Sequence, residues 1–275
     1  MFPWADYLLF LQHTDEKQVA AENIYRRLCL AHPDRTSIRI WDVGCGSGEV
    51  MTNFVKMVGS NTMLDITILE PDSQLFTIVQ DKLSQMNVGM VTYISKTLEE
   101  SNKDEDYIAG FDLIAALKML YYVDDIVDAL QQLYDALAPR GQLCISLHMP
   151  QSDAYVIRTM FREYYNVPVA SRLNIESLLA VIKRLRWKYE LQIVTSYITF
   201  SLTDVEELLE KPDDLVIMRH NVVAGITRFI GHSQTIILPP QLLVELITFY
   251  RKRARSNIVS LAIQDGYVWI NNPSC

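Results

Sequence analysis

Residues 41–49 read WDVGCGSGE, so Gly44, Gly46 and Gly48 follow directly on the apolar run 37–43. That run is β-branched and aromatic and predicts a buried strand, whereas 49–58 has helical character. Glycines between a strand and a helix allow a sharp turn and let a ligand approach the backbone closely. The spacing differs from the G-x-G-x-x-G of dinucleotide-binding proteins, and Glu49 would oppose a phosphate. We therefore expect a ligand other than a dinucleotide.

Strand-like and helix-like stretches alternate from this loop to about residue 148. The predicted strands are 37–43, 63–69, 90–95, 111–118 and 142–147. The helices between them include 73–86 and one capped by Asp124 or Asp125. Because such alternation is typical of a parallel sheet with right-handed crossovers, we predict an α/β fold with a doubly wound, mostly parallel sheet of the seven-stranded type.

After residue 150 this alternation ends. Helical character is found at 152–165, 175–184, 203–210 and 240–255, and 189–201 is a long predicted strand. Asp265-Gly266 lies between two short strand-like runs and predicts a hairpin turn. We expect a single domain over 1–275 with a core at 36–148. The parts 1–35 and 149–257 would cover the substrate at the carboxyl ends of the strands, where open α/β sheets bind ligands.

Composition excludes several classes of protein. The chain has 275 residues, of which 49% are hydrophobic and 21% charged, which rules out a disordered chain. A formal net charge of -8 argues against nucleic acid or anionic membrane as partner. No apolar run reaches the ~20 residues of a membrane span, and the start lacks the basic region of a signal peptide. Scattered cysteines and histidines suggest neither disulfides nor a metal. We expect a cytoplasmic monomer or weak homodimer with a small-molecule substrate.

The glycine loop is one part of an ordered set of features. Glu70 ends the second strand about 20 residues later, the distance at which an acid accepts ribose hydroxyls. Residues 111–117 give a fourth strand, and 137–143 read LAPRGQL before the fifth. This set resembles the class I S-adenosylmethionine-dependent methyltransferases, which have a Rossmann-like fold.

The resemblance implies S-adenosylmethionine as cofactor, S-adenosylhomocysteine as product, and no metal. Asp42 would lie near the amine of the cofactor, Gly44 and Gly46 under its methionine part, and Glu70 at its ribose. The loop 97–99 would flank the adenine. The implied cofactor-binding residues are Asp42, Gly44, Gly46, Gly48, Glu70, Thr97, Leu98 and Leu117.

Three further stretches resemble the histamine N-methyltransferase family. They are KMLYYVDDI at 118–126, FLQHTDEKQ at 10–18 and YVWINN at 267–272. The resemblance implies that Glu16 and Asn272 contact nitrogen groups of the substrate and that Tyr121 and Tyr122 wall its pocket. Glu16, Tyr121 and Tyr122 would act in catalysis, since tyrosine faces attract a sulfonium and a cationic substrate. The implied apolar lining is Tyr7, Ile157 and Phe161.

The same residues also allow plainer interpretations. Tyr121-Tyr122 can be ordinary packing at a strand end, Glu16 a solvated helix face, and Asn271-Asn272 a turn. Lys118 departs from the family, which has glutamine there. A buried ammonium would repel a cationic amine and favour a substrate with a carboxylate or phosphate. Alternatively, Lys118 points along a helix to solvent or pairs with Glu16.

A second departure lies at the end of the sequence. The family continues past its double asparagine into a closing strand, whereas this chain ends at Cys275. We expect either that the hairpin 258–270 replaces that strand or that the chain lacks it. This departure weakens the case for Asn272 and for histamine itself as substrate.

We therefore predict a methyltransferase acting on a small molecule, at an amine or imidazole nitrogen. One alternative is an anionic small molecule or amino acid methylated at a carboxylate or hydroxyl. Another is a non-catalytic module that binds adenosylmethionine. A third is a nucleic-acid methyltransferase, which the basic run 251–255 favours, although the net charge of -8 opposes it.

Overall fold

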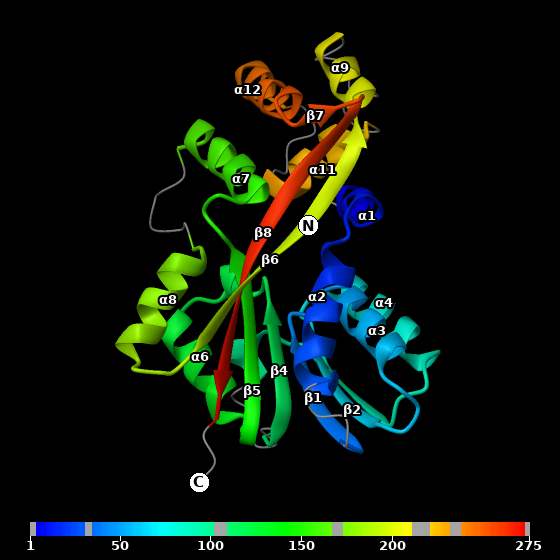
Figure 1. The fold of residues 1–275 in the computed structure, drawn as a ribbon, viewed down its shortest axis with the longest axis vertical. Coiled ribbons are helices and arrows are strands. Elements are labelled where there is room, and N and C mark those ends of the chain that lie inside the picture. The colour runs from blue at the N-terminus through cyan, green and yellow to red at the C-terminus, as the bar shows by residue number, and fades with distance from the viewer. Residues whose placement is uncertain are drawn as a thin grey trace. The chain divides into compact units, whose positions relative to one another are not determined.

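The computed structural model describes residues 4–30, 35–101, 109–166, 173–210, 221–231 and 238–272. Cys275 lies outside these residues. Along the described chain, helices and strands alternate from 37 to 148 as predicted (Figure 1). Nowhere in the described ranges is a helix both long and apolar enough to cross a membrane.

One sheet organises the fold. Its order is β3-β2-β1-β4-β5-β8-β6, and β7 pairs with β8. β1 pairs in parallel with β2 and β4, β2 with β3, and β4 with β5, which confirms a doubly wound, mostly parallel sheet. The strands are β1 Ser37–Val43, β2 Met63–Leu69, β3 Met90–Ile94, β4 Phe111–Leu117, β5 Leu137–His148, β6 Glu190–Ser201, β7 Ala254–Arg255 and β8 Ile258–Asn271.

The helices that follow the first strands begin at local signals in the sequence. Asp125 caps α6 and accepts the N–H groups of Val127 and Asp128 at 2.7 and 3.0 Å, and Asp72 caps α4 in the same way. The helices are α1 Trp4–His13, α2 Glu16–Tyr25, η1 Arg26–Leu30, α3 Glu49–Met57, α4 Ser73–Ser84, α5 Leu98–Ser101, η2 Leu120–Tyr122, α6 Ile126–Asp135, α7 Asp153–Tyr164, α8 Ile175–Arg184, α9 Leu202–Glu210, α11 Val222–Gly231 and α12 Pro240–Arg251. α2 continues into the π-helix η1, and the sequence patterns above predict neither α1 nor α11.

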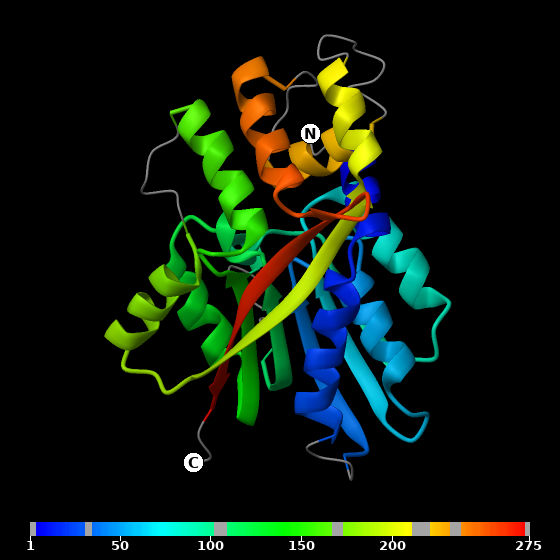
Figure 2. The same cartoon turned by 45° about the horizontal axis from the view of Figure 1, so that its top comes forward.

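The register brings the carboxyl ends of the parallel strands to one edge of the sheet. Val43 of β1 pairs with Leu69 of β2, and Leu117 of β4 pairs with Ser146 of β5. Both views show β4 and β5 side by side (Figures 1 and 2). The loops that leave these ends therefore meet, as they do around ligands in open α/β sheets.

The chain forms two compact units. The sheet unit comprises residues 17–147, 175–193 and 266–275, and the helical unit comprises 1–16, 148–174 and 194–265. The sheet unit is built around apolar strand residues such as Ile40, Ile66 and Ile114, all less than 2% exposed. In the helical unit, α1 packs on α11, and the buried guanidinium of Arg228 holds both carboxylate oxygens of Asp6 at 2.7 and 2.9 Å.

The predicted hairpin at Asp265-Gly266 is wrong, because both residues lie inside the continuous strand β8. Asp265 is 2% exposed, and Gly266 does not have the positive φ that such a turn needs. A side chain at Gly266 would collide with Ile175 of α8. The hairpin turn is instead Ser256-Asn257, with φ values of 47° and 67°, which joins β7 to β8 and ends the predicted helix 240–255 early. Residues 258–270 therefore form no hairpin, and they belong to the single strand β8 between β5 and β6.

Pro139-Arg140-Gly141, which precedes the predicted strand 142–147, is part of β5. The strand is irregular here, because the β4–β5 register shifts between Phe111 and Leu113 and Arg140 has a φ of 65°. The N–H of Arg140 donates to the carbonyl of Asn272 at 3.1 Å. Pairing with the end of β8 thus keeps this segment in the sheet.

Packing at Gly266 gives a test of the single strand β8. We expect Gly266→Ala to cost about 1–3 kcal/mol of unfolding free energy, because its methyl group would overpack against Ile175. In urea unfolding, Gly266→Ala combined with Ile175→Ala should cost less than the sum of the two single changes, by about 0.5–3 kcal/mol. Gly59→Ala is the matched control, since no atom lies within 4 Å of its added Cβ. Strictly additive costs would contradict this packing.

Candidate active site

The glycine loop adopts a conformation that side chains would prevent. Gly44, Gly46 and Gly48 have φ values of 67°, 59° and 78°, in the left-handed region that favours glycine. A Cβ on Gly44 would lie 2.6 Å from the Cβ of Met119, and one on Gly48 would collide with Val79 of α4. The first contact brings the loop after β1 against the turn after β4. The second sets α3 close to α4.

Glu70 fastens this loop to the end of β2. Its Oε2 accepts the N–H of Gly46 at 2.8 Å, and its Oε1 accepts the N–H of Asp72 at 3.0 Å. Burial raises the pKa of Glu70, while the hydrogen bonds from Asp72 and Gly46 oppose the rise. A carboxylate has about four acceptor positions, so two remain for hydroxyl groups of a ligand.

Asp42, near the end of β1, is a buried acid whose hydrogen bonding is incomplete. Its side chain is 4% exposed, and its Oδ2 has no hydrogen-bond partner among the described residues. Burial, followed by the charge of Glu70, raises its pKa from 3.8 to about 7, although Lys17 lowers it. An orphaned carboxylate beside an open glycine turn fits a cationic group such as an ammonium.

Glu49 does not act as the sequence suggested. Its carboxylate is paired with the ammonium of Lys82 and accepts the hydroxyl of Ser47, and Lys82 also donates to the carbonyl of Ser47 at 2.9 Å. Burial tends to raise the pKa of Glu49, but the hydrogen bonds from Lys82 and Ser47 outweigh it and the pKa is lowered. The charge that was expected to repel a phosphate is thus compensated inside the protein.

Thr97 and Leu98 begin the short helix α5. The N–H of Thr97 donates to Glu100 at 2.9 Å while its hydroxyl accepts the N–H of Glu100 at 3.2 Å, a reciprocal cap. The buried amide of Gln132 donates to the carbonyl of Leu98 at 2.9 Å and fixes α5 to α6. Leu117 is the last residue of β4. All eight predicted cofactor-binding residues therefore belong to the sheet unit.

The turn after β4 carries Lys118, Tyr121 and Tyr122. Lys118 has a φ of 60°, and its N–H donates to the carbonyl of Ser146 at 3.0 Å. It precedes the 3-10 helix Leu120–Tyr122, so the expectation that it lies on a helix is wrong. Tyr122 is 63% exposed, whereas Leu120 is buried and anchors the turn. Tyr122 is therefore not ordinary packing at a strand end.

The other predicted substrate residues belong to the helical unit, apart from Asn272. Tyr7 is buried, with its ring 5.2 Å from that of Phe229, and Ile157 and Phe161 are buried in α7. Glu16, the first residue of α2, is 7% exposed and is therefore not a solvated face.

Asn272 lies apart from the cofactor-binding residues. Its side-chain amide donates to the carbonyls of Leu137 and Ala138 at 3.3 and 3.1 Å, at the start of β5. Leu137 pairs with Phe111, the first residue of β4, so this is the amino-terminal edge of the parallel strands. Glu70 and Asp42 stand at the opposite edge. The structure does not bring Asn272 together with them.

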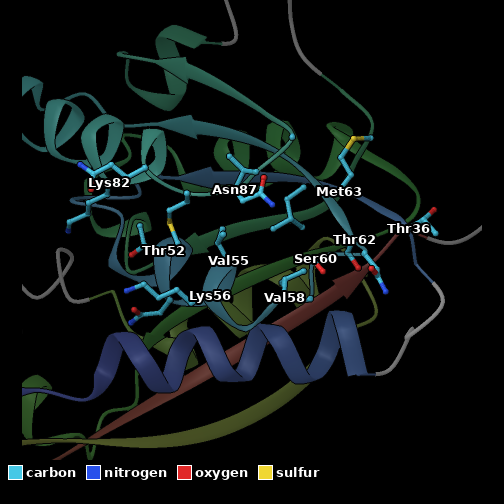
Figure 3. Close-up of a pocket in the computed structure, with 18 of the residues that line it drawn as sticks. Thr36, Thr52, Val55, Lys56, Val58, Ser60, Thr62, Met63, Lys82 and Asn87 are labelled. Carbon is cyan, nitrogen blue, oxygen red and sulfur yellow. The ribbon is translucent and has the colours of Figure 1, made fainter.

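A cavity of about 980 Å³ opens between α3 and α4 at the start of β2. Figure 3 shows Thr52, Val55 and Lys82 from the two helices around it, with Met63 of β2 and Asn87 opposite. Asp42, Gly44 and Glu70 do not line it, so it is separate from the glycine loop. Within the described residues, no group of three or more His, Cys, Asp or Glu side chains could hold a metal ion.

Sequence reasoning missed two contacts, one beside the glycine loop and one within the helical unit. Met119 was noted only as part of a resemblance, although its contact with Gly44 joins the two loops. The pairing of His148 with Asp265, at 2.8 Å, was hidden because Asp265-Gly266 suggested a turn. No local signal reveals either contact.

A family model described as a methyltransferase domain matches residues 11–211. Histamine N-methyltransferase B of Xenopus laevis is 26% identical over 154 residues, which are 51% of this chain and 53% of that protein. A ubiquinone biosynthesis O-methyltransferase of Rickettsia bellii is 25% identical over 131 residues, 48% of this chain and 50% of that protein. The matches thus span about half the length of each relative.

A solved structure shares the fold. Phospholethanolamine N-methyltransferase 2 of Haemonchus contortus, in complex with phosphomonomethylethanolamine and S-adenosylhomocysteine, aligns with a TM-score of 0.50 and 16% identity. The alignment covers 92% of this chain and 52% of that chain. At this identity the likeness concerns the fold alone.

The raised pKa of Asp42 has a consequence for stability. As the pH rises from 3.8 towards 7, the unfolded chain ionises this acid while the folded protein keeps it protonated, so stability falls. Above pH 7 the cost is on the order of 4 kcal/mol in the ligand-free protein. We expect Asp42→Asn to raise the melting temperature at pH 8 by several degrees and to change it little near pH 4. An equal shift at both pH values would contradict this account.

Proposed function

The chain belongs to the methyltransferase-domain family, and we propose that it is an S-adenosylmethionine-dependent methyltransferase that methylates a nitrogen of a small amine or imidazole. The observation that carries this proposal is the close approach of Met119 to Gly44. It sets the turn with Tyr121 and Tyr122 beside the glycine loop. That turn is where the sequence resembles the histamine N-methyltransferases.

The residues around the loop suit the cofactor. Asp42 would bind its ammonium, Glu70 its ribose hydroxyls, and the bare backbone at Gly44 and Gly46 would lie under its methionine part. The loop with Thr97 and Leu98 would flank the adenine, and Leu117, at the end of β4, would also bind the cofactor. When bound, S-adenosylmethionine supplies an electrophilic methyl group on a sulfonium.

The remaining tasks are alignment and exclusion of water. The faces of Tyr121 and Tyr122 attract cations by about 0.5–2 kcal/mol each when desolvated. Glu16 would hold a protonated end of the substrate, and Tyr7, Ile157 and Phe161 would form its apolar wall. Fixing the acceptor nitrogen in line with the methyl group accounts for most of the catalysis that such a site needs. The acidic chain fits a small-molecule substrate better than nucleic acid. We also propose a cytoplasmic location and a monomer or weak homodimer.

A second candidate is an anionic or hydroxyl-bearing acceptor. Lys118 favours it, because its backbone is fixed at the start of the turn that carries the two tyrosines. The similarity to an O-methyltransferase of ubiquinone biosynthesis is of comparable extent to that with the N-methyltransferase. An ammonium in the pocket would stabilise a carboxylate or phosphate on the substrate.

Binding of the cofactor product provides the first test. In calorimetry we expect Glu70→Gln to weaken S-adenosylhomocysteine about 10–100-fold, since one charge-assisted hydrogen bond contributes about 1.5–3 kcal/mol. Glu70→Ala should weaken it further. Glu176→Gln, on the exposed side of α8, is the matched control and should change nothing. If Glu70→Ala binds S-adenosylhomocysteine as tightly as the unaltered protein does, Glu70 does not bind the cofactor.

The acceptor is tested with labelled S-adenosylmethionine and a panel of diamines, imidazoles, amino acids, carboxylates and phenols. We expect methylation of diamines or imidazoles, and we expect Lys118→Gln to raise kcat/KM for cationic acceptors about tenfold by removing a like charge. Methylation confined to carboxylates or hydroxyls, with a loss in Lys118→Gln, would establish the second candidate instead. If no panel member is methylated, the nitrogen-acceptor proposal fails.

A further inference from the structure

The cavity between α3 and α4 lies at the edge of the sheet unit that is opposite to the glycine loop. Thr36 precedes β1 and Met63 begins β2, so the cavity opens at the amino-terminal ends of the parallel strands. Asp42 and Glu70 stand at the carboxyl ends of the same two strands. The volume of about 980 Å³ is in the range of pockets that bind small molecules. The proposed cofactor site leaves this cavity unused.

One wall of the cavity is apolar. Val55 of α3 and Leu64 of β2 are 7% and 3% exposed, and Val88 also lines the cavity. Met63 and Met86 belong to the same lining, and Met63 is 53% exposed. Methionine sulfur makes favourable contacts with aromatic rings, and its flexible side chain adapts to their shape. An exposed methionine in a wall of buried aliphatic residues therefore suits a flat apolar ring.

The charges that line the cavity do not cancel. Its charged lining residues are Glu49, Lys56 and Lys82. The carboxylate of Glu49 is paired with the ammonium of Lys82, whereas Lys56 forms no ion pair or hydrogen bond with another described residue. One positive charge is thus left over, although the whole chain has a formal net charge of -8. Such a balance attracts an anion, and a single charge matches a carboxylate.

Helical spacing places both ammonium groups at one end of the cavity. Glu49 and Lys56 are two turns apart on α3 and so share one face of that helix. Lys82 of α4 is bonded to Glu49, and Figure 3 shows Lys56 and Lys82 at the same end of the cavity, with Thr62 at the other. Lys82 donates to Glu49 and to the carbonyl of Ser47, which leaves one of its three N–H groups for a ligand.

We propose that this cavity is a second ligand site, which binds a small aromatic carboxylate. The ring lies against Val55 and Met63, and the carboxylate accepts hydrogen bonds from Lys56 and from the remaining N–H of Lys82. The ion pair between Lys82 and Glu49 is kept, so the carboxylate and the cofactor bind at the same time. This site goes beyond the proposed function and does not depend on it.

The experiment uses the full chain, labelled at its methionine methyl groups for NMR, and three probes with the same ring. They are 2-naphthoate, neutral 2-naphthamide and cationic 2-naphthylmethylamine. We expect 2-naphthoate to shift the methyl signals of Met63 and Met86 with a Kd of about 1 mM or tighter. The amine should bind at least about tenfold more weakly, because its charge is repelled. Met119, which contacts the glycine loop, should respond to S-adenosylhomocysteine instead.

Two variants and a matched control test the individual contacts. Lys56→Gln should weaken 2-naphthoate about three- to tenfold and leave the neutral amide unchanged, because only the charge is removed. Lys183→Gln is the control, since Lys183 is also an exposed lysine in the last turn of a helix of the sheet unit but does not line the cavity. Asn87 is an exposed lining residue, and Asn87→Trp should fill the cavity and abolish binding of all three probes.

The outcomes separate this inference from the proposed function. The inference is wrong if 2-naphthoate leaves Met63 and Met86 unshifted, if Lys56→Gln binds it as tightly as the unaltered protein does, or if S-adenosylhomocysteine displaces it. Displacement would show that the carboxylate occupies the cofactor site. A protein that methylates no acceptor but binds 2-naphthoate at Met63 would lose the proposed function and keep this second site.

Discussion

The hydrogen bond from the Gly46 N–H to the Glu70 carboxylate, at 2.8 Å, is the contact on which the site depends. It joins the loop after β1 to the end of β2. With the loop held there, Gly44 meets Met119, and the turn after β4 takes its place beside it. Removing the carboxylate would therefore disturb three strand ends at once, besides removing acceptors for a ligand.

The electrostatics of the sheet unit suit a cationic cofactor. Asp42 and Glu70 are both buried acids whose pKa values burial raises, and the charge of Glu70 raises the pKa of Asp42 further. Glu49, the third acid of the loop, is neutralised by Lys82 and so does not add to this repulsion. The positive charges of an ammonium and a sulfonium on a ligand would offset this repulsion between the acids. The acids lower the stability of the ligand-free protein, a cost that is common where residues serve binding.

Asp265 shows how one local pattern can serve two structures. Aspartate followed by glycine suits a tight turn, but it also suits a strand that must pass close to a helix and carry an acid. Gly266 lets β8 pass close to Ile175 of α8, and the carboxylate of Asp265 is hydrogen-bonded to His148. The actual turn, Ser256-Asn257, lacks glycine altogether and relies on two left-handed residues.

Sequence alone determined the alternating order from β1 to β5, the strand-loop-helix glycine turn and the acid at the end of β2. These follow from periodicity, glycine spacing and capping, which act over a few residues. Only tertiary structure decided that β8 is continuous, that Glu49 is paired with Lys82 and that Asn272 braces the amino end of β5. Each of these depends on contacts between residues far apart in the chain, whose burial and partners no local pattern encodes.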